Sequence, residues 1–281
     1  MLDYYSSQIR SAFSLVELSI VLVILGLLVG GVLSGQSLIH AAELRSVATE
    51  YSRYIAATRT FRDKYFALPG DMPNATSFWG AEPLANCDGS SATPSTGTAT
   101  CNGNGNGQVS DSGYVSEEQF RYWQHLANAG LINGTYSGNF TTATQGVVTV
   151  GVNIPASKYN ANAGWDIRAW DDQPAGGTPP SAGYFFEGSY SNAFRLGSQP
   201  PASGGQSTGA FGAVFIPADA WNIDSKMDDG KPGTGSVRTL EFNDVPCNNV
   251  ALSNAVAIAT TASYNLANTA ASCTLVFPDL F

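Results

Sequence analysis

The sequence predicts an α+β fold in which one long N-terminal helix packs on an antiparallel β-sheet head with long loops. Three observations lead to this prediction. An apolar run from Phe13 to Leu33 passes into an amphipathic pattern that ends before the Leu68-Pro69-Gly70 segment. Beyond residue 70, short β-rich segments alternate with loops rich in glycine and proline. This second part has 211 residues, enough for one domain with its own core.

The apolar run is long enough to cross a membrane. Its 21 residues make a helix of about 31 Å, and a hydrocarbon core is about 30 Å thick. A polar leader precedes it and ends in the small residue Ala12. A secretory signal has the opposite order, because its small-residue cleavage site follows the apolar stretch. Cleavage before Phe13 would therefore leave the apolar helix on the mature protein.

One acidic residue, Glu17, interrupts the start of the apolar run. A carboxylate at the centre of a spanning helix costs roughly 2.5–3.5 kcal/mol, and less near the interface, so we expect Glu17 to be paired with another group. Gly26 and Gly30 are four residues apart, a spacing that permits close approach of two helices in an apolar span. A plain membrane anchor with a tolerated glutamate is the alternative interpretation.

The segment A-F-S-L-V-E-L-S-I-V-L (residues 12–22) resembles the prepilin processing motif of the type IV pilin and type II secretion pseudopilin superfamily. Ala12 matches the residue before the cut, which is more often glycine in this family. Phe13 matches the residue that becomes the N-methylated terminus, and Glu17 matches the assembly glutamate. The resemblance implies that a prepilin peptidase cuts and methylates the chain. Many pilins carry a proline within this helix, whereas this chain has none before Pro69.

The resemblance implies a pilin-like organisation: a leader (1–12), a transmembrane and filament-core helix (13–35), an amphipathic half of that helix (36–68) and an α+β head (69–281). It implies a structural subunit stored in the bacterial inner membrane as a single-pass protein. A filament assembly machinery would then extract it into a periplasmic or cell-surface filament of copies of itself or related pilins. There the Glu17 carboxylate would meet the Phe13 amine of a neighbouring subunit and set axial register. The alternatives are a minor or tip pilin acting as an adhesin or ligand-binding module, and a calcium-binding pseudopilin.

The residues after the apolar run predict a continuing amphipathic helix. Apolar positions recur every three or four residues, with charged residues between them, so one face is expected to be buried. These positions are Leu44, Val47, Tyr51, Tyr54, Ile55, Thr58, Phe61 and Tyr65. Pro69 and Gly70 end the pattern, which predicts a single helix from Phe13 to Phe66.

In the head, Ser116 to Gln119 resembles a capping box and opens a predicted helix with Phe120, Trp123, Ala127 and Leu131 facing inward. Four short β-rich segments are predicted strands: 147–154, 184–186, 211–216 and 237–242. The segments 172–181 and 196–209 are predicted loops. We expect the strands to form an antiparallel sheet wrapped on the first helix.

The head is acidic, with 17 acidic and 7 basic residues after residue 70. Phosphate contacts need a basic patch, so we expect no nucleic acid partner. The chain has no P-loop and no dinucleotide-binding pattern, and neither His40 nor His125 sits in a catalytic motif. We therefore expect no enzymatic activity. Exposed clustering of Trp165, Trp170 and Trp221 would favour the adhesin alternative.

Four cysteines, Cys87, Cys101, Cys247 and Cys273, lie in the head. Outside the cytoplasm an even number of cysteines indicates disulfides, and a zinc site is improbable with only two histidines in the chain. Proximity along the chain favours Cys87 with Cys101 and Cys247 with Cys273, one of three connectivities. The second pair would resemble the C-terminal disulfide loop of many pilins.

Two loops are calcium candidates. The loop Asn102–Asp111 alternates asparagine and glycine but lacks the acidic ligands of a calcium loop, so we favour a turn-rich loop. The segment 223–232 carries Asp224, Asp228 and Asp229, which are the candidate calcium ligands. Helix termination at Gly230 explains that segment equally well. No other cofactor is expected.

Overall fold

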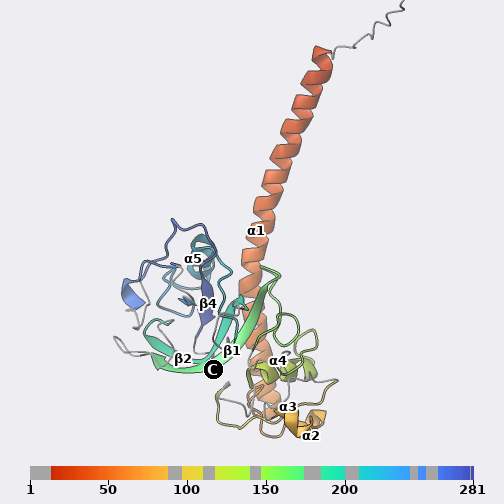
Figure 1. Ribbon diagram of the computed structural model, residues 1–281, viewed down its shortest axis with the longest axis vertical. Coiled ribbons are helices and arrows are strands. Elements are labelled where there is room, and N and C mark those ends of the chain that lie inside the picture. Colours follow the sequence, from red (N-terminus) through yellow and green to blue (C-terminus); the bar gives the residue numbers. More distant parts are fainter. Residues whose placement is uncertain are drawn as a thin grey trace, which may run out of the picture. The chain divides into compact units, whose positions relative to one another are not determined.

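The computed structural model describes residues 14–87, 97–109, 118–139, 147–173, 185–199, 209–240, 246–250, 259–278 and 280–281 (Figure 1). The chain divides into two compact units, Met1–Ala42 and Glu43–Phe281. Helix α1 (Leu15–Tyr65) supplies residues to both units. The long N-terminal helix predicted from the sequence is therefore present.

The end of α1 follows from its sequence. Arg62 and Lys64 lie in the last turn, where positive charge complements the helix dipole. Phe66 then adopts a left-handed conformation (φ 53°), and its N–H donates to the Arg62 carbonyl at 2.8 Å. Pro69 follows and cannot continue the helix. The predicted helix end is confirmed to within one residue.

The part of α1 in the second unit forms the centre of that unit's core. Its buried face carries Leu44, Val47, Tyr54 and Phe61, as the sequence predicted. The Tyr54 ring meets Trp123 of α4 (Glu118–Asn128) and Trp165 of β1 (Ala163–Gln173) edge to face, at centroid distances of 5.0 and 5.7 Å. Aromatic packing thus joins α1 to both a helix and the sheet of this unit.

The sheet is antiparallel and has the strand order β1-β2-β4-β3. The remaining strands are β2 (Gly188–Ser198), β3 (Arg238–Leu240) and β4 (Thr274–Phe277). Phe194 of β2 pairs with Phe277 of β4, and both rings contact Tyr51 of α1. Figure 1 shows the strands beside the lower turns of α1. The expected fold class, α+β with an antiparallel sheet on the helix, is present in this unit.

Most strand predictions were wrong. The segment 147–154 forms turns closed by an isolated bridge between Val150 and Ile154, and 211–216 forms only isolated bridges. The segment 237–242 contains β3, and its last two residues lie outside the described part of the chain. Tyr184 also lies outside it, and no named strand includes 185–186. The predicted loops 172–181 and 196–209 begin with the last residues of β1 and β2.

The shorter helices and the disulfides complete the unit. Helix α4 confirms the second predicted helix, although Ser116 and Glu117 lie outside the described residues. The other helices are α2 (Thr76–Trp79), α3 (Leu84–Cys87), α5 (Pro217–Met227) and the 3-10 turn η1 (Ala259–Thr261). The disulfides are Cys87–Cys101 and Cys247–Cys273, the two pairings expected from proximity along the chain.

Candidate functional site

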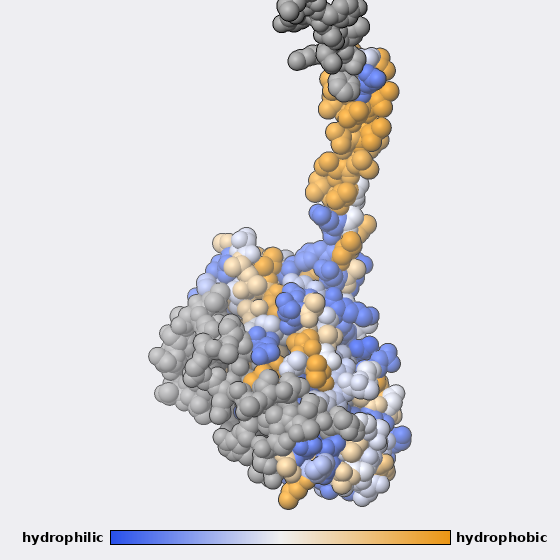
Figure 2. Space-filling model, turned by 45° about the vertical axis from the view of Figure 1, so that its right-hand side comes forward, coloured by the Kyte–Doolittle hydropathy of each residue, from blue (hydrophilic) through white to orange (hydrophobic). Residues whose placement is uncertain are grey.

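The first unit presents an apolar helix surface. Every large hydrophobic side chain from Leu15 to Ile39 is at least 50% exposed, and Figure 2 shows apolar residues covering the visible face of this half of α1. The helix is long and apolar enough to cross a membrane. A helix that is apolar on all sides is stable only when lipid or other helices surround it. This surface is the first candidate site.

The start of α1 is a capping box built from Ser14 and Glu17. The Ser14 hydroxyl accepts the Val16 N–H at 3.2 Å, and the Glu17 carboxylate accepts the Ser14 N–H at 2.9 Å. Two backbone donors that lack partners within the helix are thereby satisfied. Within one chain, the glutamate that the sequence singles out for assembly therefore caps its own helix.

The other predicted assembly residues lie on the same surface. A Cβ atom added at Gly26 or Gly30 would meet no other atom within 4 Å, so both positions are open to a neighbouring helix. The predicted cleavage site between Ala12 and Phe13 lies outside the described residues. Gly31 and Gly35 are open in the same way, so the described part of the site consists of an apolar surface, one capping carboxylate and four open glycines.

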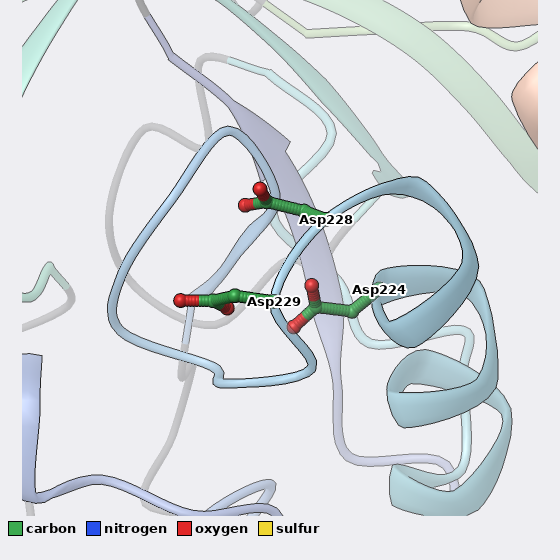
Figure 3. A group of neighbouring side chains, drawn as sticks. All are labelled: Asp224, Asp228 and Asp229. Carbon is green, nitrogen blue, oxygen red and sulfur yellow. The ribbon is translucent and has the colours of Figure 1, made fainter.

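The acidic loop that follows α5 is the second candidate site. Carboxylate oxygens of Asp224, Asp228 and Asp229 all lie within 4.8 Å of one another (Figure 3). Asp224 is buried on α5, whereas Asp228 and Asp229 are exposed in the loop. The sequence therefore identified three carboxylates that the fold brings together, a donor type suited to calcium.

Each of these carboxylates also organises the loop. Asp224 accepts the Tyr264 hydroxyl at 2.8 Å and the Gly230 N–H at 3.1 Å. Asp228 accepts the N–H groups of Ser236 and Val237, and Asp229 accepts the Lys231 N–H. Burial raises the pKa of Asp224 to about 7 against the effect of these hydrogen bonds, and the charges of its two acidic neighbours raise it further. A bound cation would favour the ionised form of all three groups.

The other calcium candidate, the loop from Asn102, is a turn structure in its described part. The Asn104 and Asn106 amide oxygens each accept the N–H two residues ahead, and Asn102 caps Thr76. The Asp71 carboxylate accepts the N–H groups of residues 105, 106 and 107 at 2.6–3.0 Å. This agrees with the turn-rich interpretation.

Buried polar groups, which sequence reasoning missed, join the elements of the second unit. Glu50 of α1 is 4% exposed. Its carboxylate accepts the Trp165 indole N–H and the Ser157 hydroxyl at 2.8 Å each, and the Lys158 N–H at 2.9 Å. Glu50 therefore fixes α1 against β1 and the turn before it. No local pattern marks it, because its partners lie more than 100 residues away along the chain.

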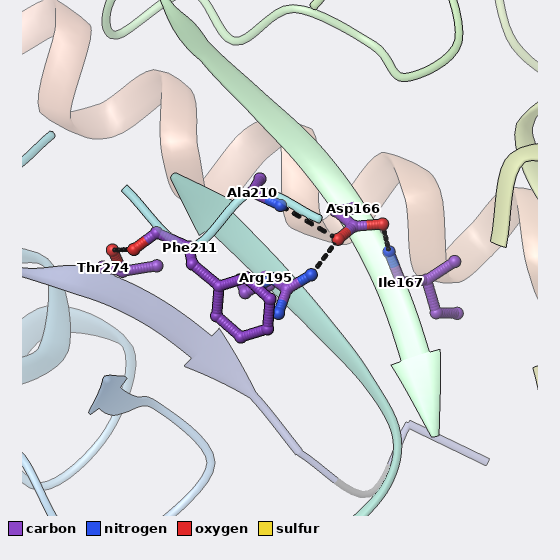
Figure 4. Close-up of polar contacts among 6 residues, drawn as sticks. All are labelled: Asp166, Ile167, Arg195, Ala210, Phe211 and Thr274. Carbon is purple, nitrogen blue, oxygen red and sulfur yellow. Dashed lines mark hydrogen bonds and ion pairs between the residues drawn. The ribbon is translucent and has the colours of Figure 1, made fainter. Parts of the chain in front are cut away.

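A second buried pair joins β1 to β2. The Arg195 guanidinium donates to the Asp166 carboxylate, and both side chains are fully buried (Figure 4). Asp166 also accepts the N–H groups of Ile167 and Ala210. The Phe211 ring centroid lies 3.6 Å from the guanidinium carbon of Arg195. These contacts join β1 and β2 to the segment that carries Ala210 and Phe211.

His125 is buried and lies in a structural network. Its Nδ1 accepts the Gly70 N–H at 3.0 Å, and its Nε2 lies 2.9 Å from the Thr100 hydroxyl. The Thr100 hydroxyl donates to Gln124, so Nε2 carries the imidazole proton and donates to Thr100. Burial lowers the pKa of His125 to about 3, and the Arg121 charge adds to the effect. The ring is thus neutral and ties α4 to the turn after α1.

The tryptophans do not form the exposed cluster that the adhesin alternative needs. Trp165 is fully buried, and Trp170 packs against Phe185 in a small core cluster. Trp221 is 44% exposed on α5. These three tryptophans therefore give no support to the adhesin alternative.

A comparison of the chain with protein-family models, with curated proteins and with solved structures found no match.

Proposed function

We propose that this chain is a structural subunit of a filament of the type IV pilus or type II secretion kind. The exposed apolar half of α1 carries the proposal. Such a surface needs lipid before assembly and neighbouring helices afterwards, and a filament core supplies the second environment. The motif from Ala12 to Glu17 supports the same function, since it resembles a prepilin processing motif.

The chemistry of Glu17 supports assembly through this helix. Cleavage before Phe13 would create an amine four residues from the Glu17 carboxylate, which already points to the helix start. In an apolar filament core, an amine and a carboxylate from neighbouring subunits attract strongly because the dielectric constant is low. Mispairing would leave a buried charge without a partner. Glu17 is therefore the residue that sets subunit register.

The head supports the proposal by its attachment to α1. Hydrogen bonds to Glu50 and aromatic contacts of Tyr51 and Tyr54 hold the head to the same helix that carries the apolar surface. A machine that extracts the helix from the membrane would then extract the head with it. Because α1 is one continuous helix, it connects the apolar surface that is extracted from the membrane directly to the head.

Expression of the full chain in its native cells tests the proposal with Glu17→Ala and, as a matched control, Ser19→Ala, both exposed residues near the helix start. Glu17→Ala is expected to be processed and membrane-bound but missing from sheared filaments. Ser19→Ala is expected in both fractions. Recovery of Glu17→Ala in filaments at the wild-type level, or absence of the wild-type chain from them, would contradict the proposal.

A further inference from the structure

Four Asn-Gly dipeptides occur in the chain, and all four lie in its described part, outside the helices and strands. Three of them form the N-G-N-G-N-G run at residues 102–107, and the fourth is Asn133-Gly134, which follows α4. All four asparagines are exposed. In an Asn-Gly dipeptide the glycine nitrogen can reach the asparagine side chain, because glycine has no Cβ to obstruct the approach. Since exposure does not distinguish the four dipeptides, differences in their chemistry must come from the glycine N–H groups.

The glycine N–H groups of the run at 102–107 all have acceptors. The Gly105 N–H donates to the Asp71 carboxylate at 2.6 Å, and the Gly107 N–H donates to the same carboxylate at 2.8 Å. The Gly103 N–H donates to the Met72 carbonyl at 2.9 Å. Asp71 and Met72 are buried in the segment after α1. The fold therefore fixes the acceptors that hold these three nitrogens.

The fourth dipeptide has no such protection. Within the described residues, neither the Gly134 N–H nor the side-chain amide of Asn133 takes part in a hydrogen bond. The backbone carbonyl of Asn133 accepts the Tyr136 hydroxyl at 3.2 Å, which engages neither of the two groups. Asn133 and Gly134 are both exposed, so water reaches the amide and the nitrogen that follows it.

The reaction open to this dipeptide is deamidation through a cyclic imide. The Gly134 nitrogen loses its proton to a base from the solvent and attacks the side-chain carbonyl carbon of Asn133. A new C–N bond forms, and the amide nitrogen takes up a proton and leaves as ammonia. Water then opens the imide at either of its two carbonyl groups, which gives aspartate or isoaspartate. In sum, one amide and one water become one carboxylic acid and one ammonia, without oxidation or reduction.

We propose that Asn133 is a site of spontaneous deamidation and that Asp71 protects Asn104 and Asn106 from the same reaction. The attacking species is the deprotonated nitrogen, and a neighbouring carboxylate opposes the formation of a second negative charge. A nitrogen bound to Asp71 must also break its hydrogen bond before it can attack, and hydrogen bonds to charged acceptors are the stronger ones. The same dipeptide thus has different reactivity at different places in one fold.

Deamidation at Asn133 would change both charge and contacts. Each event adds one negative charge to a head that already has 17 acidic and 7 basic residues. Isoaspartate also diverts the backbone through the side chain, which removes the backbone carbonyl that accepts the Tyr136 hydroxyl. An aged subunit is therefore marked by a new charge and a lost contact in the loop after α4.

Incubation of the full chain in detergent micelles, in water labelled with heavy oxygen, tests the proposal by peptide mass spectrometry. Asn133 is expected to become a labelled mixture of aspartate and isoaspartate, at a rate at least about tenfold above the rates at Asn104 and Asn106. In the unfolded and reduced chain the three rates are expected to become similar. No reaction at Asn133, aspartate as its sole product, equal rates in the folded chain, or the same rate difference in the unfolded chain would overturn the proposal.

The variant Asp71→Asn separates the effect of the carboxylate from the effect of the loop as a whole. It is expected to raise the deamidation rates at Asn104 and Asn106, because the glycine N–H groups after them donate to two different carboxylate oxygens and an amide offers only one. Asn102 is the matched control, since the N–H that follows it donates to Met72 and keeps its acceptor. Unchanged rates at Asn104 and Asn106, or an equal rise at Asn102, would overturn the role of Asp71.

Discussion

Replacing Glu50 by glutamine tests how the head is fixed to α1. One carboxylate oxygen accepts from Ser157 and Trp165, and the other accepts the Lys158 N–H. A glutamine oxygen can keep the first two donors, but its amide then faces the Lys158 N–H, donor against donor. A charged hydrogen bond is lost and a partly buried N–H is left without a partner, so we expect a loss of about 2–4 kcal/mol in unfolding free energy.

Denaturant unfolding of the full chain in detergent micelles, with the disulfides intact, measures this loss. Tryptophan fluorescence is a suitable signal because Trp165 itself donates to Glu50. Asp63→Asn removes the same charge from an exposed position of α1 and is expected to leave the free energy of unfolding unchanged. A Glu50→Gln protein as stable as the Asp63→Asn control would refute the account of Glu50.

Three further predictions concern the second unit. The pKa of His125 is about 3 in the folded protein, below the ordinary value of 6.5 in the unfolded chain. The neutral His125 ring therefore contributes fully to the free energy of unfolding above pH 6.5, and this contribution is lost as the pH falls toward 3. Between pH 7 and pH 5 the free energy of unfolding of the wild type should fall by about 2 kcal/mol more than that of His125→Asn, measured by denaturant unfolding. Equal falls in the two proteins would contradict the account of His125 as a buried neutral group. Asp166→Asn leaves the buried Arg195 charge without its carboxylate and should cost about 3–5 kcal/mol by the same assay; a cost below that of surface substitutions would refute it. If the acidic loop holds calcium, which is one of the two interpretations of its sequence, calcium at a hundredfold excess over Kd stabilises the fold by about 2.7 kcal/mol. Calorimetry should then show the gain in the wild type but not in Asp228→Asn.

Helices were readable from the sequence because their signal is local. The buried face of α1 was predicted from apolar positions that recur every three or four residues, and Pro69 predicted the helix end. These positions include Val47, Tyr51, Tyr54, Thr58 and Phe61. The Ser14–Glu17 capping box also has a local signature, Ser-x-x-Glu, that identifies it from the sequence alone. Glu17 was interpreted as an assembly residue, and the capping box was not predicted.

Apart from β3, which lies within the predicted segment 237–242, the strands were not predicted from the sequence, because long-range pairs stabilise them. Strands β1 and β2 contain Asp166 and Asn192, two residue types that are depleted in strands. Asp166 finds its partner in Arg195, 29 residues away, and Asn192 accepts the Val109 N–H from 83 residues away. The carboxylates of Asp224 on α5 and of Asp228 and Asp229 after it lie together, as their spacing within six residues allows, and their role as calcium ligands stays a prediction.

The central claim is that the apolar helix is the processed N-terminus of a filament subunit. Intact mass and N-terminal peptide analysis of the chain recovered from native membranes and from sheared filaments tests it most directly. The account predicts a chain in both fractions that begins at N-methylated Phe13. A chain that still begins at Met1, or one cut beyond Leu33, would contradict it.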